Sequence, residues 1–315
     1  MGRRMIVCVA ANPSIDKLFE VERLVPGRIH RPSAFVQVPG GKGLNVARAA
    51  HSLGAEVHAT GVLAGYAGQW LEEALGAEGV PGTFAWAEGE TRASLSVADA
   101  ETEGLTEFYE RGDDVGLQGW QRLEAVVTGV VQGAAWVTMS GNLPPGAPPD
   151  GYARLIGIAR AHGARTALDA REEALELGVD ARPDLVKVNA EEAGWLLRSE
   201  VDAEEPAGAA ALAIRERLAP DGIAIVTRGA DGAVVAMPGG GTLLGRLYAK
   251  GPYPVGSGDS FLGGLVAGLE RGLAWASAVA LALGAAAANA EMPGAGRLEA
   301  ARAEALASQA EVRPA

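Results

Sequence analysis

The stretch Pro254-Val-Gly-Ser-Gly-Asp-Ser-Phe-Leu-Gly-Gly-Leu-Val-Ala-Gly-Leu-Glu-Arg-Gly272 changes character at Asp259. After Asp259, large apolar residues recur at helical spacing as far as Leu269, and Gly272 stands where a helix would end. Before it, Gly256-Ser-Gly258 is a bend with almost no side chain. The stretch therefore predicts a bare loop that runs into a helix.

Such a junction suits a phosphate, because backbone N–H groups point outward at the positive end of the helix dipole. A carboxylate beside an anion hole suggests phosphoryl transfer, with the amides of Gly256, Ser257 and Gly258 holding charge and Asp259 accepting a proton. An alternative is that Asp259 only caps the helix after a glycine turn. These residues alone leave both interpretations open.

The composition favours one large globular domain spanning residues 1–315, because 48% of the residues are hydrophobic and can fill a sizeable core. A net charge of -12 disfavours a nucleic-acid or anionic-membrane partner. Cys8 is the only cysteine, which excludes an internal disulfide and fits a reducing cytoplasm. The uncharged run 272–290 is too weakly apolar for a membrane span and predicts a buried helix.

The order of the predicted elements indicates an α/β fold with a doubly wound, mostly parallel sheet flanked by helices. A buried strand at 5–11 ends in a turn that carries Asp16, and strands and helices alternate plainly from residue 134 onward. Segments at about 17–38 and 90–111 alternate like strands of a small exposed sheet. The acidic segment Ser199–Gly208 is predicted to be a loose linker.

Polar residues directly follow the predicted strands, where ligands of open α/β sheets bind. In chain order they are Asp16, Ser140, Asp169, Lys187 with Asn189 and Glu192, and Thr227 with Gly229 and Gly232. We expect all of them at one rim of the sheet.

A second glycine-rich loop, Gly40-Gly-Lys-Gly43, precedes a helix that Gly54 ends. Backbone can approach a ligand closely here, although the spacing is not that of a Walker A loop. Lys42 taken alone is typical of a solvated lysine.

Several other candidates have structural alternatives. Asn189 and Glu192 can hold magnesium through waters, but they also match a helix capping box. Thr227, Gly229 and Gly232 can lie against a nucleotide, yet the glycines also suit a hairpin turn. Arg92 can reach a substrate phosphate or be an ordinary surface arginine.

Taken together, the motifs resemble those of the ribokinase-like sugar kinases of the phosphofructokinase B family. Both family signatures are present in order, as Gly40-Gly-Lys-Gly-Leu-Asn-Val-Ala-Arg48 and Val255-Gly-Ser-Gly-Asp-Ser260, and the resemblance runs from Asn12 to about Gly294. The pair is highly specific. It implies a ribokinase-like fold with a small β-sheet lid, and direct transfer of the ATP γ-phosphoryl group with Asp259 as general base.

Further motifs resemble the branch of the family that acts on sugar phosphates. They are Asn12-Pro-Ser-Ile-Asp16, Thr91-Arg92, Thr106-Glu107 and Ser140-Gly-Asn-Leu-Pro-Pro-Gly146. The resemblance implies substrate contacts from Asp16, Gly40, Gly41, Lys42, Asn45, Arg92, Ser140 and Arg28, and nucleotide contacts from Lys187, Asn189, Thr227, Gly229, Gly232 and Asn289. It further implies ATP and Mg²⁺ as cofactors, with Asn189 and Glu192 near the metal, and a homodimer formed through the lid.

That branch includes 1-phosphofructokinases, tagatose-6-phosphate kinases and minor 6-phosphofructokinases, and Lys42 resembles the first two. We therefore expect fructose 1-phosphate as substrate, with fructose 6-phosphate and tagatose 6-phosphate as alternatives. Two departures, Val188 in place of proline and Ser257 in place of alanine, remove no functional group. A rival from another class is a sugar-phosphate sensor without catalysis, which would have no reason to keep Asp259.

Overall fold

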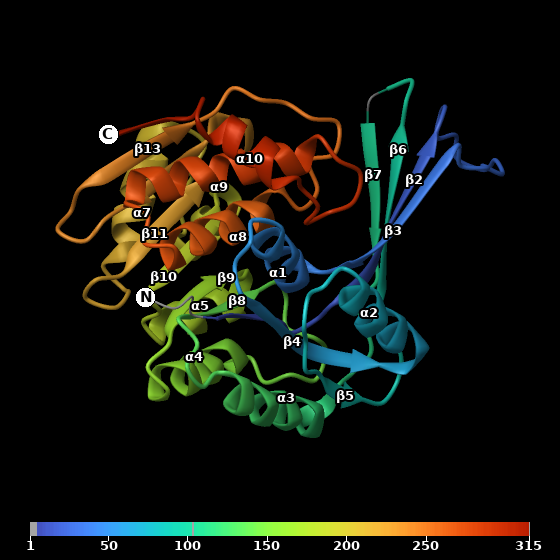
Figure 1. Ribbon diagram of the computed structural model, residues 1–315, viewed down its shortest axis with the longest axis horizontal. Coiled ribbons are helices and arrows are strands. Elements are labelled where there is room, and N and C mark those ends of the chain that lie inside the picture. Colours follow the sequence, from blue (N-terminus) through green and yellow to red (C-terminus); the bar gives the residue numbers. More distant parts are fainter. Residues whose placement is uncertain (1–4, 103, 315) are drawn as a thin grey trace.

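Strand β1 (Ile6–Ala10) is buried along its whole length, because helices cover both faces of the sheet to which it belongs. Ile6 and Cys8 pack into one hydrophobic core, and Val7 and Val9 into the other. The computed structural model describes residues 5–102 and 104–314. Figure 1 shows the resulting layers, with a small second sheet standing beside the main body.

The main sheet has ten strands. From edge to edge they are β14 (Glu311–Pro314), β13 (Thr242–Arg246), β12 (Ala233–Ala236), β11 (Ile223–Thr227), β10 (Leu185–Asn189), β9 (Arg165–Asp169), β8 (Trp136–Ser140), β1, β4 (Val57–Ala64) and β5 (Ala85–Ala87). The strands from β11 to β5 run parallel, whereas β12, β13 and β14 join antiparallel. The predicted α/β class and mostly parallel sheet are therefore confirmed.

The helices divide between the two faces of the main sheet. One face carries α1 (Lys42–Ser52), α2 (Gly65–Ala77), α8 (Ser257–Glu270), α9 (Trp275–Ala290) and α10 (Ala300–Ala307). The other carries α3 (Gly116–Val130), α4 (Gly151–Ala161), α5 (Glu172–Asp180), α6 (Ala190–Leu197) and α7 (Glu204–Arg215). Within the described ranges, no helix combines the length and the apolar character needed to cross a membrane.

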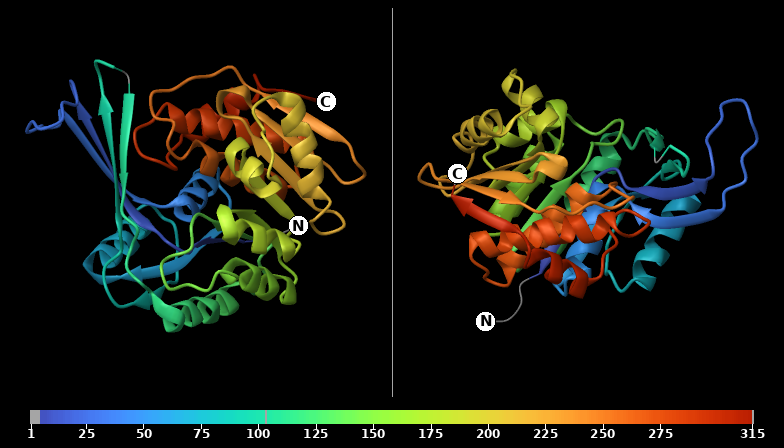
Figure 2. Two further views of the ribbon diagram at one scale, coloured as in Figure 1. Left: turned by 180° about the vertical axis from the view of Figure 1, so that it is seen from behind. Right: turned by 90° about the horizontal axis from the view of Figure 1, so that it is seen from above.

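The small sheet has four strands in the order β3 (Ala34–Gly40), β2 (Ser14–Val21), β6 (Ala93–Asp99) and β7 (Gly104–Tyr109). Its strands come from the two segments whose alternation predicted a small exposed sheet. Figure 2 shows it projecting from the main body, with the connection between β2 and β3 extending furthest. The sheet stands over the rim where the parallel strands of the main sheet end.

Two sequence predictions were wrong. Asp16 lies inside β2, paired with Val38 and Ser94, and not in a turn after β1, because β2 begins at Ser14. The predicted linker Ser199–Gly208 is helical from Glu204, where α7 begins. Val201 and Ala207 of this segment pack into the core, so low apolar content did not make it loose.

Helices α8 and α9 pack closely through small residues. A Cβ on Gly264 would lie 2.8 Å from the Ala285 Cβ and 3.1 Å from the Ala282 Cα, so the helices would have to separate. By contrast, Gly157 on the exposed side of α4 has open space around it. These two helical glycines therefore differ in what an added methyl group meets.

We predict opposite effects for the matched substitutions at these positions. Gly264→Ala lowers the free energy of unfolding by about 1–3 kcal/mol through overpacking. Gly157→Ala raises it by about 0.5–1 kcal/mol, because alanine is the better helix former. Urea denaturation of both variants measures the difference. Equal midpoints for the two would contradict the close packing of α8 on α9.

Candidate active site

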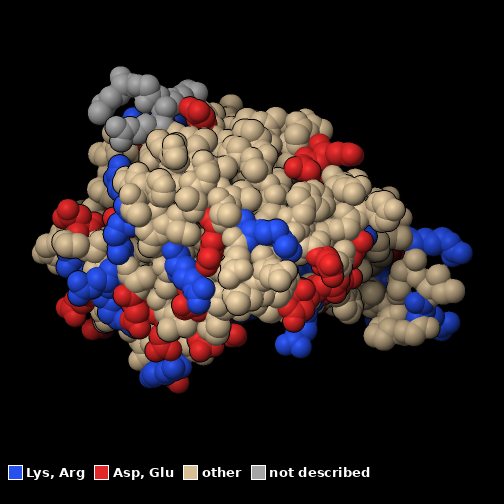
Figure 3. All heavy atoms as spheres, turned by 90° about the horizontal axis from the view of Figure 1, so that it is seen from below, with Lys and Arg blue, Asp and Glu red and all other residues tan. Residues whose placement is uncertain are grey.

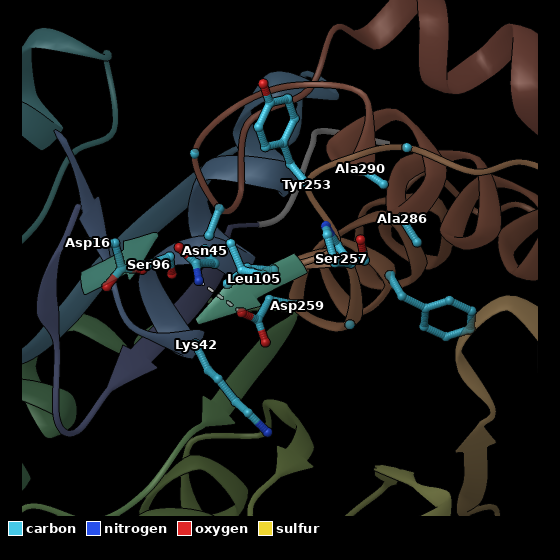
Figure 4. Close-up of a pocket in the computed structure, with 18 of the residues that line it drawn as sticks. Asp16, Lys42, Asn45, Ser96, Leu105, Tyr253, Ser257, Asp259, Ala286 and Ala290 are labelled. Carbon is cyan, nitrogen blue, oxygen red and sulfur yellow. Dashed lines mark hydrogen bonds between the residues drawn. The ribbon is translucent and has the colours of Figure 1, made fainter. Parts of the chain in front are cut away.

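A cavity of about 950 Å³ opens where the carboxyl ends of the parallel strands face the small sheet. It brings together most of the residues singled out in the sequence: Asp16, Gly41, Lys42, Asn45, Arg92, Lys187, Asn189, Thr227, Gly229, Gly232, Gly256, Ser257, Gly258 and Asp259. Figure 4 shows Asp16 to one side and Ser257 to the other, with Asn45 and Asp259 hydrogen-bonded to each other between them. Of the residues expected at the rim, Asp16, Lys187, Asn189, Thr227, Gly229 and Gly232 therefore share this pocket, whereas Ser140, Asp169 and Glu192 do not line it.

The first turn of α8 presents backbone N–H groups to this cavity. Gly256 is the N-cap, with a left-handed φ of 82°, and no side chain caps the helix there. The capping interpretation of Asp259 is therefore wrong. The amide of Ser257 donates to the Pro254 oxygen at 3.1 Å. Among the described residues, the amides of Gly256, Gly258 and Asp259 have no acceptor, so these three, and not the Ser257 amide, are free to bind an anion.

The Asp259 carboxylate is 6% exposed, and Asn45 Nδ2 donates to its Oδ2 at 2.9 Å. Burial raises the pKa of Asp259 to about 7. The negative charge of Asp169 adds to this rise, whereas Lys42, Lys187 and the Asn45 hydrogen bond oppose it. The Asn45 Oδ1 is buried at the cavity with no partner in the described chain. It is an acceptor ready for a hydroxyl group.

Asp16 is fixed on the small sheet by local contacts. The Ser14 hydroxyl donates to Asp16 Oδ1 at 2.5 Å, and the Gly41 amide donates to Oδ2 at 3.4 Å. A Cβ on Gly40 would lie 2.1 Å from the Asp16 Cγ, so only glycine leaves room for the carboxylate. Gly40 therefore shapes the pocket without lining it.

Arg92 stands near Asp16, immediately before β6. Its guanidinium donates to Asn12 Oδ1 at 3.1 Å and to the Ser94 hydroxyl at 2.9 Å. The side chain is half-buried and lines the cavity. No carboxylate within ion-pair distance of it is found in the described ranges, so its charge is available to an anion.

Two lysines, the partly exposed Lys42 and the buried Lys187, form an ionic cluster with two buried acids at the base of the cavity. Lys42 Nζ lies 2.9 Å from Asp169 and 3.2 Å from Glu192, and Lys187 Nζ lies 2.6 Å from Asp169. Burial alone would raise the pKa of Asp169, but the two lysines outweigh it and lower the pKa. Lys42 is therefore not the solvated lysine that its sequence context also allowed.

Asn189 and Glu192 form a complete capping box at the start of α6. Glu192 N donates to Asn189 Oδ1 at 2.8 Å, and Asn189 N donates to Glu192 Oε2 at 2.9 Å. Glu192 Oε1 also accepts from Lys42. These oxygens are already used as acceptors, so they fit a magnesium ion only through water molecules. Within the described ranges, no three His, Cys, Asp or Glu side chains gather into a metal site.

The far end of the cavity has a bare backbone and an apolar wall. Thr227 ends β11, and Gly229 and Gly232 bound the short 3-10 helix η1 (Gly229–Asp231) in an antiparallel hairpin. The opposite wall was not predicted as part of a site, and it consists of Leu247, Leu283, Ala286, Ala287 and Ala290. The only available signal was the uncharged alanine run, which α9 turns toward the cavity (Figure 4).

Some predicted site residues do not line the cavity. Arg28 is exposed in the loop between β2 and β3, and Ser140 is buried at the end of β8. Asn289 is fully buried and hydrogen-bonded to the loops around α8. Conversely, Glu107 and Tyr109 of β7 and the main-body residue Tyr253 do line it.

Comparison with known proteins places this geometry in context. The sequence model of a protein family described as "pfkB family carbohydrate kinase" matches residues 4–301 of this chain. Among curated proteins, 1-phosphofructokinase of Bacillus subtilis (strain 168) is 28% identical over 278 residues, covering 85% of this chain and 87% of that protein.

Solved structures agree along nearly the whole chain. Phosphofructokinase-2 from Escherichia coli in complex with fructose-6-phosphate is 26% identical, with a TM-score of 0.86, over 98% of this chain and 99% of that one. A possible 1-phosphofructokinase from Thermotoga maritima has a TM-score of 0.89 over 99% of each chain. At 22% identity, the latter likeness shows the fold alone.

Proposed function

We propose a phosphorylated ketohexose as the acceptor substrate of this chain, which belongs to the pfkB family of carbohydrate kinases. The chain is a phosphotransferase with an alcohol group as acceptor. The observation that carries the proposal is the buried Asp259 carboxylate, which lies beside free amides of α8 and is hydrogen-bonded to Asn45. A hydroxyl group placed between Asn45 Oδ1 and Asp259 would meet both an acceptor and a base.

The proposed reaction is a direct transfer without a phospho-enzyme. Asp259 accepts the proton of the attacking sugar hydroxyl, the sugar oxygen forms a bond to the γ-phosphorus, and the bond to ADP breaks. The amides of Gly256, Gly258 and Asp259 stabilise the negative charge of the group in transfer. Asp16 would hold further sugar hydroxyls from the opposite wall, since its carboxylate faces the same cavity.

ATP and magnesium fit the other half of the cavity. The bare turn at Gly258 lies next to a cation, because a Cβ there would be 3.1 Å from Lys187 Nζ. We propose that this end takes the phosphates and that Thr227, Gly229 and Gly232 lie along the nucleotide. A magnesium ion bound with ATP would neutralise phosphate charge, with Asn189 and Glu192 contacting its waters.

The phosphate already on the sugar is assigned to Arg92, because its guanidinium lines the cavity without an ionic partner in the described chain. Lys42 lines the same cavity and lies beside the loop that follows Ser140, since a Cβ on Gly141 would lie 3.5 Å from the Lys42 Cβ. Arg28 would reach a substrate only if the β2–β3 loop moves or serves another subunit.

Fructose 1-phosphate is the proposed substrate, supported by the resemblance to the Bacillus subtilis 1-phosphofructokinase. The complex of the Escherichia coli phosphofructokinase-2 with fructose-6-phosphate supports fructose 6-phosphate as the alternative. Tagatose 6-phosphate remains a third candidate. A sensor without catalysis is disfavoured by the intact carboxylate and anion site.

We predict that ADP release from ATP and Mg²⁺ is fastest with fructose 1-phosphate in a panel with fructose 6-phosphate, tagatose 6-phosphate, fructose and ribose. In Arg92→Met the KM for the phosphorylated sugar rises roughly 10- to 100-fold, because a hydrogen bond to a charged group contributes about 1.5–3 kcal/mol. The exposed Arg122→Met on α3 is the control and leaves KM unchanged. Turnover only with unphosphorylated sugars would refute the assignment of Arg92.

The raised pKa of Asp259 implies an acid limb in the pH profile. A base works only when ionised, so kcat falls about tenfold for each pH unit below 7 and levels off above it. Lys42 holds this pKa down and Asp169 holds it up. Removing the charge of Lys42 or of Asp169 should therefore shift the pKa of Asp259 in opposite directions.

We predict that Lys42→Met moves the acid limb of kcat to higher pH and that Asp169→Asn moves it to lower pH. Titration of the substrates is common to all three enzymes and cancels in the comparison. The measurement is kcat between pH 5 and 9 at saturating substrates. If the acid limbs of kcat coincide in the wild type and both variants, the ionisation of Asp259 does not set that limb.

The small sheet is proposed to act as a lid and as a dimer contact. Its inner face carries Asp16, and Tyr253 of the main body donates to Glu20 of β2 at 2.7 Å. Its outer face exposes Phe35 and Phe108, which are 55% and 57% accessible. A second copy of the chain would cover this apolar face.

Light scattering after size exclusion tests the dimer. The wild type is expected at twice the chain mass, and the double variant Phe35→Ser with Phe108→Ser at the monomer mass. The control is Leu117→Ser, which removes a similarly exposed apolar side chain from α3 and is expected to remain dimeric. A wild type of monomer mass would refute the proposal.

On the face of the molecule seen in Figure 3, acidic and basic side chains are interspersed.

A further inference from the structure

Asn289, near the end of α9, joins the segments that build the anion site. Its Nδ2 donates to the Val255 oxygen at 2.9 Å and to the Ser257 hydroxyl at 3.3 Å. Its Oδ1 accepts from the Ser260 hydroxyl at 3.1 Å and from the Gly296 amide at 2.8 Å. Both donors and both lone pairs of the carboxamide are thus used, and the side chain is fully buried.

The loop 295–296, which Asn289 contacts, lies between the turn before α8 and the start of α1. A Cβ on Gly256 would lie 2.7 Å from the Ala295 Cβ, and a Cβ on Gly296 would lie 2.7 Å from the Asn45 Cα. The backbone of residues 295–296 therefore separates the turn before α8 from the start of α1. By fixing this loop and the turn together, Asn289 sets where the free amides lie relative to Asn45.

The chemistry of the position requires a carboxamide. An aspartate would keep the acceptor contacts to Ser260 and Gly296 but lose both N–H donors, leaving its charge against the Val255 carbonyl. An alanine would lose all four contacts. The contact to Ser257 also gives a use to that hydroxyl group, which stands where the family resemblance predicts alanine.

We propose that Asn289 is a positioning residue for phosphoryl transfer, acting through the turn 255–257 and the loop 295–296 and touching neither substrate. This rests on the proposed function. It replaces the sequence-based expectation that Asn289 contacts the nucleotide, because the side chain does not line the cavity and has no free donor or acceptor.

The test compares Asn289→Ala and Asn289→Asp with the control Thr166→Val. Thr166 is also fully buried, and its hydroxyl donates to Asp184 at 2.9 Å at the start of β9, the end remote from the cavity. The control thus loses a buried hydrogen bond without disturbing the site. Steady-state kinetics give kcat and KM for ATP, and hydrogen exchange with mass spectrometry follows the peptide 254–262.

We expect kcat to fall roughly 10- to 100-fold in both Asn289 variants, somewhat less than loss of a whole oxyanion donor. The KM for ATP stays within about threefold, and exchange of the peptide 254–262 accelerates. Thr166→Val lowers the melting temperature with kcat and that exchange unchanged. If Asn289→Ala does not fold, Asn289→Asp keeps two contacts and carries the test.

A raised KM for ATP with kcat retained would make Asn289 a nucleotide ligand and overturn the proposal. Unchanged kcat and unchanged hydrogen exchange in folded variants would make Asn289 a merely structural residue, and this result would also overturn the proposal. A wild type that turns over no sugar phosphate would instead refute the proposed function. The exchange measurement would then still decide whether Asn289 orders the turn.

Discussion

The site depends on the close contact between α1 and α8. A Cβ on Gly263 would lie 2.8 Å from the Val46 oxygen and 3.0 Å from the Ala49 Cβ, so the two helices touch backbone to backbone. Because both helices begin at the cavity, their first turns meet there. This contact brings Asn45 of α1 to 2.9 Å from Asp259 of α8. Residues more than two hundred positions apart thus form one reactive pair.

Charge placement then divides the cavity into regions with different chemistry. Lys42 and Lys187 are tied to Asp169, so the lysines are held in place and the buried acids are balanced. Arg92, in contrast, has no carboxylate within ion-pair distance in the described chain. An overall net charge of -12 therefore coexists with a local site for anions.

The sequence was informative wherever function needs a local backbone feature. The glycines of both loops, the helix ends at Gly54 and Gly272, and the strand ends at the rim follow from short-range sterics and hydrophobic periodicity. Sequence reasoning failed where distant segments decide the outcome. Asp16 joined β2 because β3 and β6 pair on both sides of it, and no local signal shows that pairing.

Other misses have the same cause. The amide of Ser257 was expected in the anion site, but the turn to Pro254 uses it. Asn289 was assigned by resemblance to the nucleotide, and only the fold shows that it is enclosed between the turn 255–257, the loop 295–296 and the first turn of α8. The apolar wall of α9 could not be told from an ordinary buried helix, because both have the same alanine-rich pattern.

The proposed phosphoryl transfer depends most directly on Asp259 acting as the base. Asp259→Asn keeps the shape of the side chain and removes its basicity, so its single-turnover rate with ATP, Mg²⁺ and fructose 1-phosphate is the most direct measurement. We predict a rate roughly 10²- to 10⁴-fold below wild type. The sugar-phosphate dissociation constant, measured by calorimetry, is expected to stay unchanged within about threefold. Turnover of Asp259→Asn at the wild-type rate would contradict the role of Asp259 as the base.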